Sequence, residues 1–321
     1  MSRMSRREFV ALAATGAATA PFVLSNTSAS AAISAQAIVD RIKQNVGVEW
    51  KPETVDTFKA GDPAITATGI VTTAMATMDV LKKAVAAGAN LVITTEPTFY
   101  GRSDGAAPPP GRGVGPGAAP GAVATPPRPD PVLAAKRDFI AKNNLVVWRF
   151  SDHWRLRKPD PLAEGLIDAL GWSRFRAADD PRRPPSPSSA AARVSISAVR
   201  LDALAAEIRK KLNARGGIRV IGDPQTRVQT IAVLPGSTAL QASLNALPGV
   251  DVLIAGEVRE WETVEYARDV VDAGGRKGLI LLGRVVSEDP GMKVCAAWIK
   301  TIVPELTTTW IAAGDPYWRP L

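Results

Sequence analysis

An internal repetition is the feature that most constrains how this 321-residue chain can fold. Gly61-Asp62-Pro63 recurs as Gly222-Asp223-Pro224. Each tripeptide is followed by an apolar strand pattern, a helix pattern, a small-residue turn and a second apolar strand. Alternating helix and strand patterns indicate α/β layers. The sequence therefore predicts an α/β fold of two pseudo-repeated lobes.

Both copies of the repeat reach a glutamate at the same distance. Asp62 and Glu96 are 34 positions apart, and so are Asp223 and Glu257. The Gly-Asp-Pro tripeptide by itself is an ordinary turn sequence, but a turn does not explain the matched spacing. Two superimposable lobes would place Glu96 and Glu257 at equivalent strand ends, where open α/β sheets bind ligands.

The periodicity of apolar residues predicts the individual elements. In the first copy they are a helix over 35–46, a strand over 65–71, a helix over 75–87, a strand over 90–94, a helix over 131–143 and a strand over 145–150. In the second copy they are a helix over 198–214, strands over 218–221 and 230–234, a helix over 239–246 and a strand over 252–255.

The N-terminus has the pattern of a twin-arginine signal peptide. Arg6-Arg7 precedes an uncharged, Ala-rich run, and Ala29-Ser30-Ala31 resembles a cleavage site. An amphipathic first helix is the alternative, but the run has no polar face. We expect residues 1–31 to be removed and the protein to be periplasmic or otherwise exported through the twin-arginine pathway.

Composition divides the remaining chain. Residues 105–131 are dominated by Gly, Pro and Ala, and residues 181–194 are rich in Pro, Ser and Ala, so neither segment can pack a core. The expected organisation is a first lobe over 32–180 that contains the insertion 105–131, a linker over 181–194, and a second lobe over 195–321.

Charge and cysteine content exclude several classes of protein. The formal charge is +8, but the basic residues are scattered without an aromatic platform, which argues against a nucleic-acid partner. No later run reaches the ~18 to 20 apolar residues of a membrane span, so none is expected in the mature protein. The single cysteine, Cys295, cannot form an internal disulfide and is expected in the core.

Four segments carry a family resemblance: residues 91–99 (LVITTEPTF), 150–154 (FSDHW), 256–261 (GEVREW) and 283–288 (GRVVSE). In order and context they resemble the Nif-three-like family of dinuclear metal-centre proteins, which includes type-two GTP cyclohydrolase homologues. The resemblance covers nearly all of 36–316 except the insertion. It implies two metals between the lobes and a homo-oligomer, of which a hexamer is the common form.

The resemblance also implies the site residues. The candidate metal ligands are Glu96, Asp152, His153 and Glu288. Further residues expected to line the site are Thr95, Asp104, Ser151, Arg155, Glu257 and Arg284. Thr95 and Arg284 stand where the family has histidines, and Ser151 and Arg155 stand where exported relatives are expected to have them. No catalytic residue is assigned.

These departures leave two hypotheses about function. In the first, Arg284 with Arg155 replaces the metal by pairing with Glu288 and Glu96, and the protein binds an unknown small molecule or acts as a scaffold without catalysis. In the second, a carboxylate-rich site holds Mn, Mg, Zn or Fe and activates water, as in a metal-dependent hydrolase. Arginine cannot deprotonate to become a ligand, so the sequence favours the first.

His153 has its own alternatives. It is the only histidine in the chain and follows a predicted strand. It is expected either to take part in the site, with Asp152 as an orienting partner, or to be a hydrogen-bonded structural residue.

Overall fold

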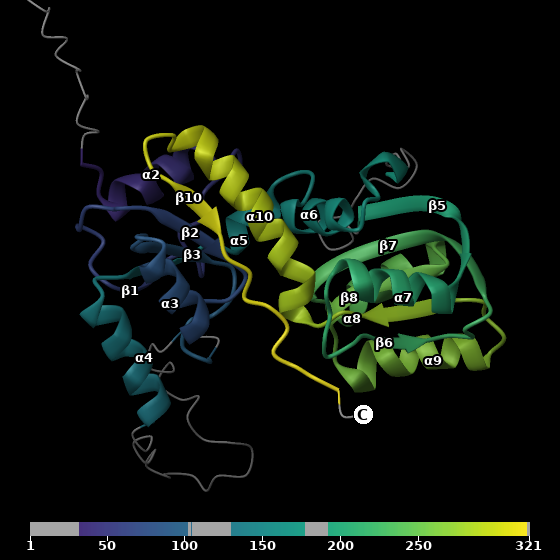
Figure 1. Cartoon of the computed structure of the whole chain (residues 1–321). Helices are drawn as coiled ribbons and strands as arrows, with labels where there is room; N and C mark the ends of the chain where they lie inside the picture. Colours follow the sequence, from purple (N-terminus) through teal and green to yellow (C-terminus); the bar gives the residue numbers. More distant parts are fainter. Residues whose placement is uncertain (1–31, 102–103, 105–129, 177–191, 320–321) are drawn as a thin grey trace, which may run out of the picture. The chain divides into compact units, whose positions relative to one another are not determined.

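The computed structural model describes residues 32–101, 104, 130–176 and 192–319. It contains two five-stranded sheets, each with parallel central strands and flanking helices (Figure 1). The predicted α/β class with two pseudo-repeated lobes is confirmed. The proposed signal peptide, residues 105–129 of the insertion and residues 181–191 of the linker lie outside the described residues.

The first sheet has the strand order β1-β4-β3-β2-β10. Its strands are β1 (Phe58–Ala60), β2 (Ile70–Thr73), β3 (Leu91–Thr94), β4 (Val146–Arg149) and β10 (Thr308–Trp310). Every residue of β2, β3 and β4 is buried, as is typical of parallel strands covered on both faces. The predicted strand over 65–71 starts later, because the Thr68 N–H donates to the Asn90 side chain and not to a neighbouring strand.

The second sheet repeats this arrangement with the order β5-β7-β8-β9-β6. Its strands are β5 (Ala192–Arg200), β6 (Arg219–Ile221), β7 (Arg227–Ser237), β8 (Val252–Glu257) and β9 (Gly278–Leu281). Strands β7, β8 and β9 are parallel like β2, β3 and β4. β6 pairs antiparallel with β9, just as β1 pairs with β4. The sequence repeat is therefore also a repeat of topology.

The helices of the first lobe begin at side chains that cap them. The helices are α2 (Ala35–Asn45), α3 (Met78–Ala86), α4 (Pro131–Lys142), α5 (Asp152–Leu156) and α6 (Pro161–Ala169). Ser34, Thr77, Asp130 and Asp160 each accept a hydrogen bond from a backbone N–H in the first turn of α2, α3, α4 and α6. Such caps satisfy donors that have no partner inside the helix, which is why the predicted starts of α2 and α4 agree with the structure.

The second lobe contains α7 (Leu201–Lys211), α8 (Leu240–Ala246), α9 (Glu265–Asp272) and α10 (Arg284–Ile302). Short helical turns are η1 (Ser173–Phe175), η2 (Leu247–Gly249) and the π-helical η3 (Glu260–Val264). The helix predicted over 198–214 is shorter at both ends in the structure, where it is α7. Its first residues instead belong to β5, which pairs antiparallel with β7.

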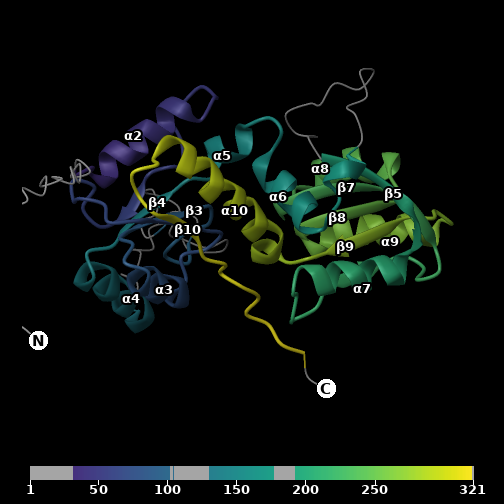
Figure 2. The same ribbon diagram turned by 45° about the horizontal axis from the view of Figure 1, so that its top comes forward.

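Helix α10 connects the two lobes (Figures 1 and 2). It packs on α6, on β2 and β10 of the first sheet, and on β7 and β8 of the second. Helices α6 and α10 meet at two glycines, Gly165 and Gly291, where backbone contacts backbone. This close approach lets one helix reach the cores of both lobes.

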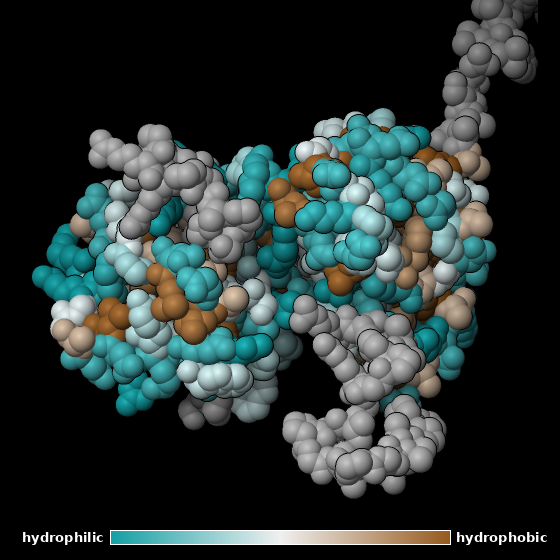
Figure 3. Space-filling model, turned by 180° about the vertical axis from the view of Figure 1, so that it is seen from behind, coloured by the Kyte–Doolittle hydropathy of each residue, from teal (hydrophilic) through white to brown (hydrophobic). Residues whose placement is uncertain are grey.

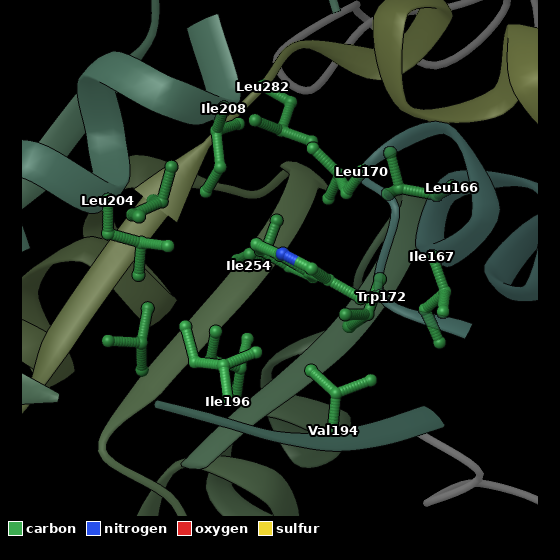
Figure 4. Close-up of a cluster of buried hydrophobic side chains, with 14 of the residues drawn as sticks. Leu166, Ile167, Leu170, Trp172, Val194, Ile196, Leu204, Ile208, Ile254 and Leu282 are labelled. Atoms are coloured by element: carbon green, nitrogen blue, oxygen red, sulfur yellow. The ribbon is translucent and has the colours of Figure 1, made fainter. Parts of the chain in front are cut away.

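Two segments cross the lobe boundaries expected from the sequence. β10 lies in the range assigned to the second lobe but pairs parallel with β2 of the first sheet. Leu166, Ile167, Leu170 and Trp172 lie in the range assigned to the first lobe but pack in the hydrophobic core of the second (Figure 4). In both cases the segment buries apolar side chains in the core of the other lobe.

Cys295 is fully buried in the first hydrophobic core, as expected. Burial raises the pKa of its thiol far above the ordinary value, so the reactive thiolate is suppressed. Among the described residues, no helix combines the length and the apolar character needed to cross a bilayer. The face shown in Figure 3 is mostly hydrophilic, with separate hydrophobic patches.

Candidate functional site

Two buried carboxyl groups meet below the carboxyl end of β3. Glu96 follows β3 and is 2% exposed, and Glu288 lies in the first turns of α10 and is 0% exposed. The Thr95 hydroxyl donates to Glu288 Oε2 at 3.0 Å. Burial, and then the nearby Glu288, raise the pKa of Glu96 to about 8, against the opposing effect of Arg284. The two neighbouring carboxyl groups therefore favour retaining a proton between them.

Arg284 links this pair to the second lobe. Its Nε lies 2.9 Å from Glu96 Oε1, but its N–H is not aligned with that oxygen, so the two groups lie close without a hydrogen bond. Its Nη1 donates to Glu257 Oε1 at 3.3 Å. The two glutamates at matching positions in the repeat thus contact one arginine, at the first residue of α10.

Arg155 holds the other carboxylate. It projects from α5, and its Nη2 pairs with Glu288 Oε1 while its Nη1 donates to the carbonyl oxygen of Pro235 at 3.3 Å. Gly236 passes beside this pair with a φ of +79°, and a Cβ at that position would lie 2.2 Å from Glu288 Oε1. The bulge in β7 therefore requires glycine, because a side chain would separate Arg155 from Glu288.

Asp152 and His153 lie in a separate network centred on Asp56. The Asp56 carboxylate accepts from the backbone N–H groups of Ser151, Asp152 and His153, which form the start of α5. The Asp152 side chain points elsewhere: its Oδ2 accepts from the Thr54 hydroxyl at 2.8 Å and from the Val55 N–H at 3.1 Å. These contacts fasten the segment 51–56 to α5.

Both ring nitrogens of His153 are engaged inside this network. Nε2 accepts from the Lys51 N–H at 2.9 Å, so the ring proton is on Nδ1, which lies 2.8 Å from Asp56 Oδ2. The ring is 0% exposed and stacks on Trp50 with 3.7 Å between centroids. In this arrangement neither nitrogen is free to bind a metal, and Asp56, not Asp152, orients the ring. This is the geometry of a hydrogen-bonded structural residue.

Asp104 is also separated from the glutamates. Its Oδ1 accepts from the N–H groups of Thr98 and Phe99, and its Oδ2 lies 3.8 Å from Lys59 Nζ and 3.9 Å from Arg149 Nη1. The carboxylate therefore stabilises the loop after β3 and offsets the charges of the partly buried Lys59 and the buried Arg149.

The metal ligands implied by the family resemblance do not fit these residues. The four candidates fall into two sets, Glu96 with Glu288 and Asp152 with His153. Within the described part of the chain, no three His, Cys, Asp or Glu side chains come close enough to hold one ion. The donor chemistry agrees with this separation, because a guanidinium group already lies against each glutamate and would repel a metal cation.

A cavity of about 800 Å³ lies beside the Arg155–Glu288 pair. Its lining residues are Lys51, Glu53, Thr54, Asp152, His153, Arg155, Leu156, Lys158, Asp160, Leu234, Pro235, Ser237, Thr238, Ala239, Gln241 and Ala242. The cavity therefore has one wall from the segment 51–54 and α5, and another from the end of β7 and the start of α8. Its volume lies in the range of small-molecule sites.

Sequence reasoning missed Asp56 and the wall formed by β7 and α8. Asp56 lies outside every recognised segment, and a single aspartate has no signature of its contact with a histidine 97 positions away. The sequence of residues 234–242 indicates only the end of a strand and the start of a helix, and gives no sign of a cavity wall.

Residues 158–305 match the model of the family described as Duf34/NIF3 (NGG1p interacting factor 3). No curated protein matches the chain. The chain is similar in structure to a Bacillus cereus protein related to NIF3, with a TM-score of 0.63 and 11% identity over 90% of this chain and 99% of that one.

Two further solved structures are similar over almost their full length. Protein SA1388 of Staphylococcus aureus gives a TM-score of 0.61 and 16% identity over 90% of this chain and 99% of its own. HcgD from Methanocaldococcus jannaschii gives a TM-score of 0.55 and 14% identity over 87% of this chain and 97% of its own. At these identities the likeness establishes the shared fold.

Proposed function

We propose that this chain is a member of the Duf34/NIF3 family that binds a small molecule without metal catalysis. The observation that carries the proposal is the pairing of Arg155 with Glu288 and of Arg284 with Glu96, next to a cavity of about 800 Å³. Together the two guanidinium groups supply the positive charge that a metal would otherwise bring to this buried pair of carboxyl groups. The family match over 158–305 and the shared fold support the family assignment.

The metal content of the native protein tests this proposal. We expect signal-free protein, purified without chelator or affinity tag, to contain much less than one equivalent of Mn, Mg, Zn or Fe per chain by elemental analysis. Glu288→Gln serves as the matched variant, because it removes a carboxylate and retains the side-chain shape. One or two equivalents in the native protein, lost in Glu288→Gln, would contradict the proposal and favour a metal-dependent hydrolase.

We also propose that the protein is a homo-oligomer. Trp261, Tyr317 and Trp318 are 74%, 71% and 77% exposed, and large exposed aromatic side chains are enriched at protein interfaces. We expect light scattering to give a mass of several chains and Trp261→Ala/Trp318→Ala to lower it. A monomeric native protein at ~50 µM would contradict this, since obligate interfaces remain associated at such concentrations.

Export through the twin-arginine pathway remains part of the proposal. It is supported by the sequence of residues 1–31, in which Arg6-Arg7 precedes an uncharged run. Folding before transport would suit a chain whose two lobes exchange β10 and the segment around Trp172.

A further inference from the structure

Strand β10 leaves one edge of the first sheet open. It is the edge strand beside β2 (Figure 1). The Ile70 N–H donates to the Thr307 carbonyl oxygen at 2.9 Å, so every second residue from 307 onward faces β2. Because alternate residues direct their backbone groups to opposite sides, Thr308 and Trp310 direct theirs away from β2. No described residue forms a hydrogen bond with the N–H or C=O groups of these two residues.

The other edge strands of the two described sheets carry charged residues. The four edges are β1 and β10 in the first sheet and β5 and β6 in the second. β1 contains Lys59, β5 contains Arg193 and Arg200, and β6 contains Arg219. Such charges on an edge strand oppose its pairing with another chain. β10, with the sequence TTW, has no charged residue and lacks this protection.

There is open space beside this edge. A pocket of about 480 Å³ is lined by Lys300, by the loop 304–307 and by Thr308 and Thr309 of β10. Thr309, in the middle of the strand, is exposed. An added strand would lie about 4.8 Å from β10. The edge therefore has both the unpaired backbone groups and the room that a further strand requires.

We propose that β10 pairs antiparallel with β10 of a second copy of this chain, about a two-fold axis at Thr309. This register places Thr308 of one copy opposite Trp310 of the other, so that each N–H faces a C=O group and the outward backbone groups of both strands are paired. The edge is therefore self-complementary, as a two-fold interface requires, and the strands bring no like charges together. The inference rests on the proposed homo-oligomer and identifies one of its interfaces.

Cross-linking of Thr309→Cys in the signal-free chain tests this register. Residues on the axis form a non-hydrogen-bonded pair with Cα atoms about 4.5 Å apart, which a disulfide can span. The native Cys295 is 0% exposed and does not compete. We expect oxidation by copper phenanthroline to convert most of this variant to a thiol-reversible dimer on a non-reducing gel. The control Lys82→Cys, at an exposed position on α3, should remain mostly uncross-linked.

Charged variants test the same contact without a covalent bond. Thr309→Glu and Thr309→Lys each place like charges opposite one another across the axis and should weaken association at least about tenfold. An equimolar mixture of the two should restore association, because opposite charges then face each other. Lys82→Glu, away from the edge, should leave the affinity within about twofold. Light scattering over a concentration series measures all four samples, and circular dichroism shows whether each variant is folded.

Two results would overturn the inference: Thr309→Cys cross-linking no faster than Lys82→Cys, or a mixture of Thr309→Glu and Thr309→Lys that associates as weakly as either variant alone. The mass of the native protein reports separately on the homo-oligomer. A native oligomer whose Thr309→Cys variant does not cross-link would contradict only this interface. A monomeric native protein would contradict both proposals.

Discussion

Arg155→Ala is expected to lower the free energy of unfolding by about 3 kcal/mol. Glu288 is fully buried, and Arg155 is its cationic partner. Removing the guanidinium leaves a buried carboxyl group whose ionised form is costly in a medium of low polarity. The effect should lie at the low end of the ~3 to 5 kcal/mol typical of broken buried pairs, because the Arg155 side chain is 28% exposed. Urea denaturation at pH 7 measures it.

Two further variants distinguish the loss of the Arg155–Glu288 pair from a general effect of removing an arginine. Arg155→Ala/Glu288→Gln should recover most of the loss, since no buried charge is left unpaired. Arg268→Ala removes an arginine whose side chain is 63% exposed, in the ion pairs of α9, and should cost less than about 0.5 kcal/mol. An Arg155→Ala protein as stable as the native one, without added metal, would refute the idea that the arginine replaces a metal.

Gly165→Ala is expected to cost about 3 kcal/mol or more, at the upper end of overpacking effects. A Cβ at Gly165 would lie 2.5 Å from both the Gly291 nitrogen and the Pro290 carbonyl oxygen. Both atoms belong to the backbone of α10, so no side chain can rotate away and the two helices must separate. That separation would disturb both cores, because α10 packs on both sheets. Thermal and urea denaturation should both report the loss.

Ala169→Leu is the matched control for this close approach. Ala169 lies on the exposed side of the same helix, so added bulk there meets solvent and should change stability by less than about 0.5 kcal/mol. Gly291→Ala should reproduce the effect of Gly165→Ala, since its Cβ would lie 2.5 Å from Leu162 Cα. Equal stabilities of Gly165→Ala and Ala169→Leu would show that the helices can move apart at little cost.

Local pattern was enough to predict much of the fold. The buried parallel strands have apolar runs in the sequence, and capping residues such as Ser34 and Asp130 mark helix starts because they satisfy free backbone donors. The sequence analysis did not predict β1, α5, α6, or the later elements α9, β9, α10 and β10. β1 has only three residues, and α6 has apolar side chains around most of its circumference, so neither has a clear period.

For the site, the sequence by itself determined which residues are present and where the repeat places them. It showed that Thr95 and Arg284 cannot serve as imidazole ligands, and that Glu96 and Glu257 occupy equivalent positions. These conclusions depend on residue chemistry and on spacing along the chain, which need no knowledge of distant contacts.

Only the tertiary structure decided how those residues are paired. Arg155 and Glu288 are 133 positions apart, and Asp56 contacts His153 across 97. Such contacts depend on how α5, α10 and the segment 51–56 pack together, which no local pattern encodes. The packing of the segment 51–56 on α5 assigns the single histidine to a buried hydrogen-bond network. The cavity beside Arg155 forms only where α5 of one lobe faces the end of β7 in the other.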